Sequence, residues 1–144
     1  NGGCMVFNGV CLKTWSTTQA VRALSSAEAE YYAALKRASM ALGFRSMAAD
    51  LGENIKVIFR TDSSAALGII GRQGLGKVRH LETGYLWLQD IVSQRRLAIR
   101  KVKGTENPAD LSIKYLRSED VEKDLKFLGF SFRTGRSKAV PSIK

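Results

Sequence analysis

The sequence predicts an α/β domain, because short apolar runs typical of strands alternate with longer segments that have helical spacing. Residues 25–50 are rich in alanine, whereas residues 55–60 and 97–102 are short runs that contain valine and isoleucine. The chain has 144 residues, of which 44% are hydrophobic, and this is enough for one globular core. The predicted order is a hairpin, a long helix, a strand, a short helix, a long helix, a strand and a helix.

The first element is predicted to be a β-hairpin. Asn8-Gly9 is a dipeptide that readily forms a two-residue type I′ turn, and apolar runs flank it on both sides. Such a turn pairs Phe7 with Val10. Because side chains alternate between the two faces of a strand, four apolar side chains should share one buried face. These are Met5, Phe7, Val10 and Leu12.

The predicted hairpin register also bears on the two cysteines, Cys4 and Cys11. It places them diagonally from each other, about 7–8 Å apart, which is too far for an unstrained disulfide. Both should therefore be free thiols, and a reducing compartment is the simpler interpretation. Two cysteines do not support a zinc site.

The long helix should begin at a capping box, in which Ser25 caps the first turn and Glu28 reaches back to it. The helical wheel does not choose between Glu28 and Glu30 as a functional acid, and an isolated glutamate on a helix is most often solvated. Alanines beside Glu30 would let another backbone approach it. Gly52 breaks the helical pattern. The predicted apolar stripe consists of Leu24, Tyr31, Leu35, Ala38 and Leu42.

Asp62 follows directly after the strand predicted at residues 55–60 and precedes a short helix at 64–70. It can act simply as the N-cap of that helix. It can also belong to a ligand site, because such sites gather at the carboxyl ends of strands in open α/β sheets. The glycine run at residues 71–76 lacks the Lys-Ser/Thr of a P-loop, which argues against a nucleotide site.

A second long helix is predicted at residues 78–93, followed by the strand at 97–102. Asn107 then suits the cap of a last helix and Pro108 its first position. Asp110 lies in the first turn, where a carboxylate also favours the helix dipole. This structural role is sufficient to explain Asp110 taken alone.

The chain is strongly basic, with 23 Lys plus Arg against 13 Asp plus Glu and a net charge of +10. This excess favours a polyanionic partner such as nucleic acid, although it can also serve solubility alone. No apolar run approaches the roughly 20 residues of a membrane span and no signal segment opens the chain, so we expect a soluble intracellular protein. The predicted nucleic-acid contacts are Arg72, Lys77, Arg79, Arg100, Lys101 and Lys103.

Glu30, Asp62 and Asp110 come from three different predicted elements. Carboxylates that are distant in sequence and converge in space are what a divalent-metal phosphodiester site needs, because hard cations prefer oxygen ligands. A two-metal site clamps the attacking and leaving oxygens between ions about 3.5–4 Å apart. The three acids are therefore the predicted metal ligands.

Several spaced blocks closely resemble the ribonuclease H domain of copia-type retrotransposon polyproteins. The resemblance runs from about Gly2 to Gly129. Its blocks are Ala-Leu-Ser-Ser-Ala-Glu-Ala-Glu-Tyr-Tyr-Ala-Ala at 23–34, Thr-Asp-Ser-Ser-Ala-Ala at 61–66 and Asn-Pro-Ala-Asp-Leu at 107–111, with Trp-Ser at 15–16 and Lys-Val-Arg-His-Leu-Glu at 77–82.

The resemblance implies a ribonuclease H-like fold over residues 1–128, a mixed sheet flanked by helices, with a basic tail at 129–144. It also implies hydrolysis of the RNA strand of an RNA–DNA hybrid by two Mg²⁺ ions, or Mn²⁺, held by Glu30, Asp62 and Asp110. The implied partner is the reverse transcriptase part of the same polyprotein. The implied location is the cytoplasmic retroelement particle, and also the nucleus.

The chain departs from the family pattern in two ways. The family's first metal-binding aspartate lies on a strand that would precede Asn1, and the loop before Asp110 lacks the histidine of cellular ribonucleases H. We therefore expect a chain without its central first strand, marginally stable and inactive or nearly so by itself. Two alternatives stay open, a catalytically inactive nucleic-acid-binding remnant and an integrase-like or resolvase-like DNA-processing relative.

Overall fold

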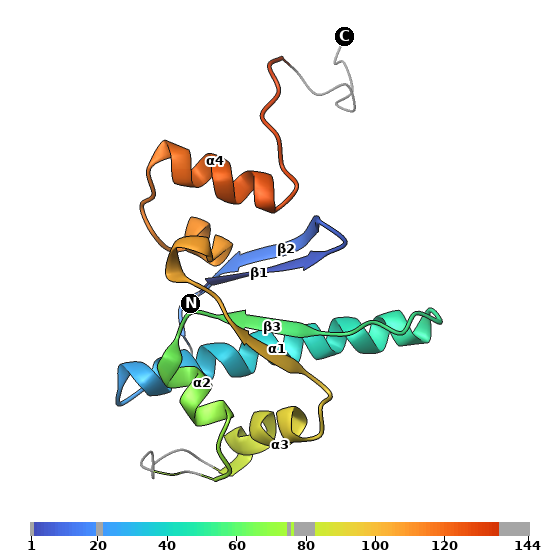
Figure 1. Ribbon diagram of the computed structural model, residues 1–144, viewed down its shortest axis with the longest axis vertical. Coiled ribbons are helices and arrows are strands. Elements are labelled where there is room, and N and C mark those ends of the chain that lie inside the picture. The colour runs from blue at the N-terminus through green and yellow to red at the C-terminus, as the bar shows by residue number, and fades with distance from the viewer. Residues whose placement is uncertain (1, 20–21, 75, 77–82, 136–144) are drawn as a thin grey trace.

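The computed structural model describes residues 2–19, 22–74, 76 and 83–135. It is a mixed α/β structure, as predicted, with helices around small sheets (Figure 1). The predicted contacts Lys77 and Arg79 and the single histidine, His80, lie outside the described residues. The elements are β1 Gly2–Phe7, β2 Val10–Ser16, α1 Ser26–Asp50, β3 Ile58–Thr61, α2 Ser64–Ile70, the 3₁₀ helix η1 Thr83–Leu86, α3 Trp87–Ser93, β4 Ala98–Lys101, the 3₁₀ helices η2 Gly104–Glu106 and η3 Pro108–Ser112, and α4 Ser118–Phe127.

β1 and β2 form the predicted hairpin. Phe7 pairs with Val10, and Asn8 and Gly9 both have positive φ angles, of 50° and 77°, as a type I′ turn requires. A bulge after Met5 then shifts the register. The predicted buried face is wrong, because Val10 is 60% exposed and Phe7 and Leu12 are also exposed. The tip of this two-stranded ribbon lies largely uncovered, although the Phe7 ring contacts Phe44 of α1 edge-on at 5.9 Å.

The bulge leaves the predicted relation between the cysteines intact. Val6 pairs with Cys11, so Cys4 lies on the same strand two residues from the partner of Cys11. Both cysteines are free thiols, as predicted. The hairpin is tied to the end of α4 by a backbone hydrogen bond of 3.2 Å from the Cys11 amide to the Leu128 carbonyl.

α1 begins and ends where the sequence predicts. The Ser25 side chain caps the helix by accepting a hydrogen bond of 3.2 Å from the Glu28 amide, and Gly52 follows the end with a φ of 84°. Tyr31 and other residues of the apolar stripe are buried, but Leu24 is 73% exposed because it precedes the cap and lies outside the helix. No helix in the described part of the chain is long and apolar enough to cross a membrane.

β3 and β4 form a second, parallel pair in which Ile58 lies opposite Ala98 and Thr61 opposite Lys101. The main core lies between this pair and helices α1, α2 and α3. Within residues 83–93, the predicted second long helix is a 3₁₀ turn followed by α3. The helix predicted after Pro108 is the 3₁₀ helix η3. The main core residues are Tyr31, Ala34, Leu35, Ala38, Phe59, Ala66, Ile69, Ile70, Leu88 and Leu97.

The described strands form two separate two-stranded sheets and not one continuous sheet. In Figure 1 the hairpin lies on one side of β3 and β4, and the helices of the main core lie on the other. The β1 and β3 arrows point in opposite directions. α1 contacts both sheets and spans the space between them.

Candidate functional site

The three predicted acids lie at three different points of the fold. Glu30 is exposed in the second turn of α1, Asp62 is half-buried directly after β3, and Asp110 is 7% exposed in η3. Because β3 and β4 are parallel, their C-terminal ends lie at the same end of the sheet. Asp62, which follows β3, therefore lies at the same end as the loop that leads from β4 to η3. A Cβ atom added to Gly104 of that loop would lie 3.6 Å from Oδ2 of Asp62.

Two cations connect these acids electrostatically. The pKa of Lys114 is raised, first by its hydrogen bond to Asp110 and also by the charges of Asp110, Asp62 and Glu30. Burial lowers the pKa of Arg37, and the charges of Glu30, Asp62 and Asp110 counteract this effect. All three carboxylates therefore interact with the same two side chains.

Asp62 is not the helix cap that one interpretation of the sequence predicted. The N-cap of α2 is Ser63, whose Oγ accepts a hydrogen bond of 3.1 Å from the Ala66 amide. The Ser63 amide in turn donates to Oγ1 of Thr61 at 3.2 Å. The neighbouring serine takes the capping role, so capping does not explain the aspartate.

Asp110 is held in place from both sides. The Asn107 side chain caps η3 by accepting a hydrogen bond of 3.3 Å from the Ala109 amide, which confirms the predicted cap. The Lys114 Nζ donates to Oδ2 of Asp110 at 2.7 Å. The Asp110 carboxylate is thus largely buried and has one ammonium group as its counter-ion.

The structure separates the two glutamates that the helical wheel could not distinguish. Glu28 is 2% exposed and accepts two hydrogen bonds of 2.8 Å, from the Leu24 amide and from the Tyr32 hydroxyl. It therefore stabilises the start of α1, as predicted, although its carboxylate reaches the residue before the cap. Glu30 is exposed and lies among the charges described above.

The donor chemistry of Glu30, Asp62 and Asp110 fits a hard divalent cation, since all three offer carboxylate oxygens. Among the described residues, no group of three His, Cys, Asp or Glu side chains is placed to hold a metal ion. The chain therefore offers carboxylate ligands of the right kind, but one of them, Asp110, accepts a hydrogen bond from Lys114.

Comparison with known proteins gives one distant relative, the retrovirus-related Pol polyprotein from transposon TNT 1-94 of Nicotiana tabacum. The two are 26% identical over 130 residues, which is 89% of this chain. The chain is a distant homologue of a retrotransposon Pol polyprotein. It spans 10% of the length of that relative. No family model matches the sequence, and no solved structure matches it.

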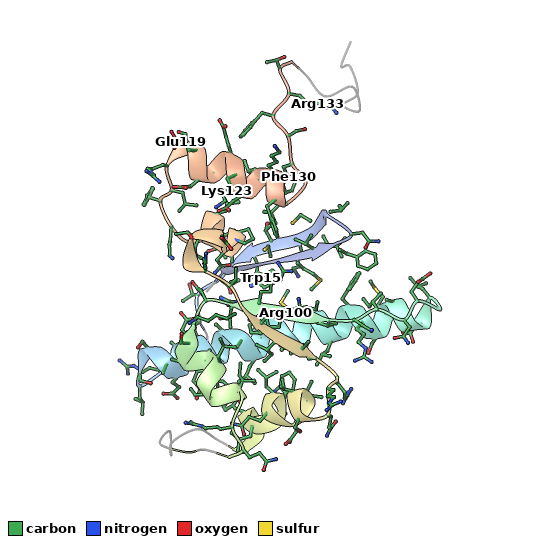
Figure 2. The ribbon with its side chains drawn as sticks, viewed as in Figure 1. Trp15, Arg100, Glu119, Lys123, Phe130 and Arg133 are labelled. Carbon is green, nitrogen blue, oxygen red and sulfur yellow. The ribbon has the colours of Figure 1, made fainter. Side chains whose placement is uncertain are left out.

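Three of the predicted basic contacts lie together on β4 and directly after it. Arg100, Lys101 and Lys103 are all exposed, and Figure 2 shows Arg100 on this strand. The Lys101 Nζ donates to Oγ of Ser64 at 2.7 Å, which ties β4 to the start of α2. Arg72, by contrast, is half-buried after α2. The exposed basic residues therefore lie on β4 and directly after it, at the end of the sheet where Asp62 also lies.

Sequence reasoning missed Arg37 and Lys114. Both follow a predicted acid at helical spacing: Arg37 is seven residues after Glu30, and Lys114 is four residues after Asp110. These spacings place an acid and a base on one helical face, so the signal was present. What the sequence could not show is that both bases interact with all three acids.

Proposed function

We propose that this chain is a ribonuclease H-like domain of a retrotransposon Pol polyprotein and that the domain hydrolyses the RNA strand of RNA–DNA hybrids. One observation carries the proposal: Glu30, Asp62 and Asp110 come from distant elements and interact with the same two cations, Arg37 and Lys114. The distant relationship to a Pol polyprotein supports the same biological setting.

In this proposal the three carboxylates hold Mg²⁺ or Mn²⁺. When bound, these ions would activate water and stabilise negative charge on the phosphate and the leaving oxygen. Lys114 would have to leave Asp110, and at 54% exposure its side chain is free to swing toward solvent or toward a phosphate. Arg37 is half-buried, and its positive charge offsets part of the combined negative charge of the three acids.

The hybrid itself would be recognised by its backbone. Arg100, Lys101 and Lys103 are exposed on β4 and directly after it, so each can contact a backbone phosphate. Ribose 2′-hydroxyl groups would distinguish the RNA strand without reading its sequence. The proposed partner is the reverse transcriptase part of the polyprotein, and the proposed location is the cytoplasmic retroelement particle and the nucleus.

A second candidate is a nucleic-acid-binding remnant without catalysis. Two observations favour it: the described residues hold no ready cluster of three metal ligands, and Lys114 already neutralises Asp110. In this case the basic residues would still bind nucleic acid, whereas the acids would only stabilise the fold.

A titration with Mn²⁺, followed by calorimetry or electron paramagnetic resonance, separates the two candidates. The hydrolase proposal predicts saturable binding by the wild-type chain and loss of that binding in Asp62→Asn and Asp110→Asn. The matched control is Asp120→Asn, which removes a partly exposed acid on α4. Binding that survives in Asp62→Asn, or no binding in any variant, would favour the remnant.

A further inference from the structure

The segment that follows α4 exposes two phenylalanine rings close together in the chain. α4 ends at Phe127, and residues 129–135 are all exposed. Phe130 is 53% exposed and Phe132 is 77% exposed. Figure 1 shows this segment leading away from the two sheets. Exposed apolar side chains that are grouped mark a binding surface, whereas single ones are ordinary.

The start of this segment is fixed by the helix end and by the hairpin. The Phe130 amide donates to the Leu125 carbonyl at 2.9 Å and the Gly129 amide to the Lys126 carbonyl at 3.1 Å, which is the Schellman pattern of a helix C-terminus. Gly129 has a φ of 79°, and a Cβ atom added to it would lie 2.6 Å from the Gly9 carbonyl oxygen. A ring held in this way loses little freedom when it binds a ligand.

The helix end explains the position of Phe130 only in part. In a Schellman motif the residue at this position often packs on the residue five places before it, which is Leu125 here. Such a contact uses one face of a ring, and the Phe130 side chain remains more than half exposed. Phe132 lies beyond the motif, so the helix end does not account for it. The second ring therefore calls for a ligand.

The surroundings of the two rings are positively charged. Arg133 directly follows Phe132 and is exposed, and Figure 2 shows Phe130 at the end of α4 with Arg133 farther along the segment. In the sequence no acidic residue follows Asp124, whereas five Lys or Arg residues do. The segment thus combines exposed ring faces with a positive charge that no acid of the same segment offsets.

We propose that residues 130–133 form a binding site for single-stranded nucleic acid. Bases would stack on Phe130 and Phe132, and the Arg133 guanidinium would contact a phosphate of the same strand. In a duplex the bases are stacked on one another, so their faces do not reach the rings. The site therefore selects unpaired nucleotides over a blunt hybrid. This inference does not depend on the proposed catalytic function.

The charge of the segment argues against a second copy of this chain as the occupant. Two copies would bring together cations without acids on chains that each carry a net charge of +10, and like charges repel. Nucleic acid supplies what both kinds of side chain need, because every nucleotide carries a flat aromatic base and a phosphate. It is therefore the occupant that the segment fits.

The test is fluorescence anisotropy with labelled oligo-dT and oligo-U of about 12 nucleotides, a length within the range of known single-strand sites. A blunt RNA–DNA hybrid of the same length is the control ligand. One variant combines Phe130→Leu with Phe132→Leu, and the matched variant combines Phe130→Tyr with Phe132→Tyr. Leucine keeps an apolar side chain without a ring face, whereas tyrosine keeps the ring.

The leucine variant should bind the oligonucleotides about tenfold or more weakly, because stacking is lost at both rings. The tyrosine variant should bind like wild type, and affinity for the blunt hybrid should be equal in all three proteins. A loss confined to one oligonucleotide would identify DNA or RNA as the ligand. Undiminished binding by the leucine variant, or an equal loss for oligonucleotide and hybrid, would overturn the proposal.

Two further measurements separate the phosphate contact and the competing occupant. Arg133→Gln should reduce the magnitude of the slope of log affinity against log salt by about 0.7, the contribution of one single-strand phosphate contact. Lys13→Gln removes an exposed cation elsewhere and is the control. Equal slopes for these two variants would overturn the Arg133 contact. A wild-type dimer that the leucine variant dissociates, with oligonucleotide affinity unchanged, would show that a second copy occupies the segment.

Discussion

Lys114 donates a hydrogen bond from Nζ to Oδ2 of Asp110 at 2.7 Å, across four residues of chain. Asp110 is nearly buried, whereas the Lys114 side chain is 54% exposed. Lys114 is therefore the counter-ion that Asp110 has without a metal. In the proposed hydrolase a divalent ion and Lys114 would compete for the same oxygen.

Replacing Lys114 by Met should make Mn²⁺ binding tighter, because the competing ammonium group is removed. Without metal the same variant should lose only about 1 kcal/mol or less of unfolding free energy, since half-exposed ion pairs contribute little. Calorimetric titration and urea unfolding measure the two effects. The control is Arg117→Met, which breaks an exposed ion pair of 3.1 Å with Asp120. Equal Mn²⁺ affinity in wild type and Lys114→Met would rule out the competition.

The two glutamates of α1 should give opposite results when each is changed to alanine. Glu28→Ala leaves the Leu24 amide and the Tyr32 hydroxyl without this acceptor, so it should lower the unfolding free energy by about 2 kcal/mol. Glu30→Ala should stay within about 0.5 kcal/mol of wild type, because the residue is exposed. It should instead weaken Mn²⁺ binding. A stable Glu28→Ala that has lost metal binding would reverse the assignment.

The basic residues of β4 should make hybrid binding depend on salt. Each phosphate contact contributes about −0.7 to −0.9 to the slope of log affinity against log salt concentration. Changing Arg100, Lys101 and Lys103 together to Gln should reduce the magnitude of the slope by the contribution of about two to three phosphate contacts. Lys13, Lys36 and Lys126 are exposed elsewhere and provide a control of equal charge. Equal slopes for the two triple variants would mean that binding rests on net charge alone.

Cys4 should react slowly with iodoacetamide. Burial, together with the neighbouring Cys11, raises the pKa of the Cys4 thiol from its ordinary 9.0 to about 11. Only the thiolate reacts, so the rate should still rise above pH 9 and reach about half of its maximum near pH 11. The folded chain holds this proton more tightly, so the Cys4 contribution to stability is lost as pH rises through the same range. Cys11→Ser isolates the Cys4 rate, and a plateau below pH 9 would contradict the burial effect.

Local signals predicted much of this fold. The Asn8-Gly9 turn, the Ser25 and Asn107 caps and the buried Tyr31 all follow from side chains that interact with their own segment or from helical spacing. Such interactions depend little on the rest of the chain. Sequence reasoning was therefore most reliable where only a few neighbouring residues decide the structure.

The remaining features depend on partners that are distant in sequence. Val10 is exposed because little covers the tip of the hairpin. The alternation of side chains along the two strands could not reveal this. Asp62 and Ser63 can both cap a helix, and only the backbone geometry of the structure shows that Ser63 is the N-cap of α2. The sequence also predicted three acids as metal ligands, but it could not show that their charges act on Lys114 and Arg37.

The most direct test of the proposed function is cleavage of a hybrid whose RNA and DNA strands carry different labels. We would assay three forms of the chain. The first is extended before Asn1 by a strand that carries one aspartate, the second has asparagine in place of that aspartate, and the third is not extended. The account predicts Mg²⁺-dependent cleavage of RNA alone by the aspartate form, loss of it in Asp62→Asn, and little or none in the other two. Cleavage that persists in Asp62→Asn, or that cuts the DNA strand, would contradict it.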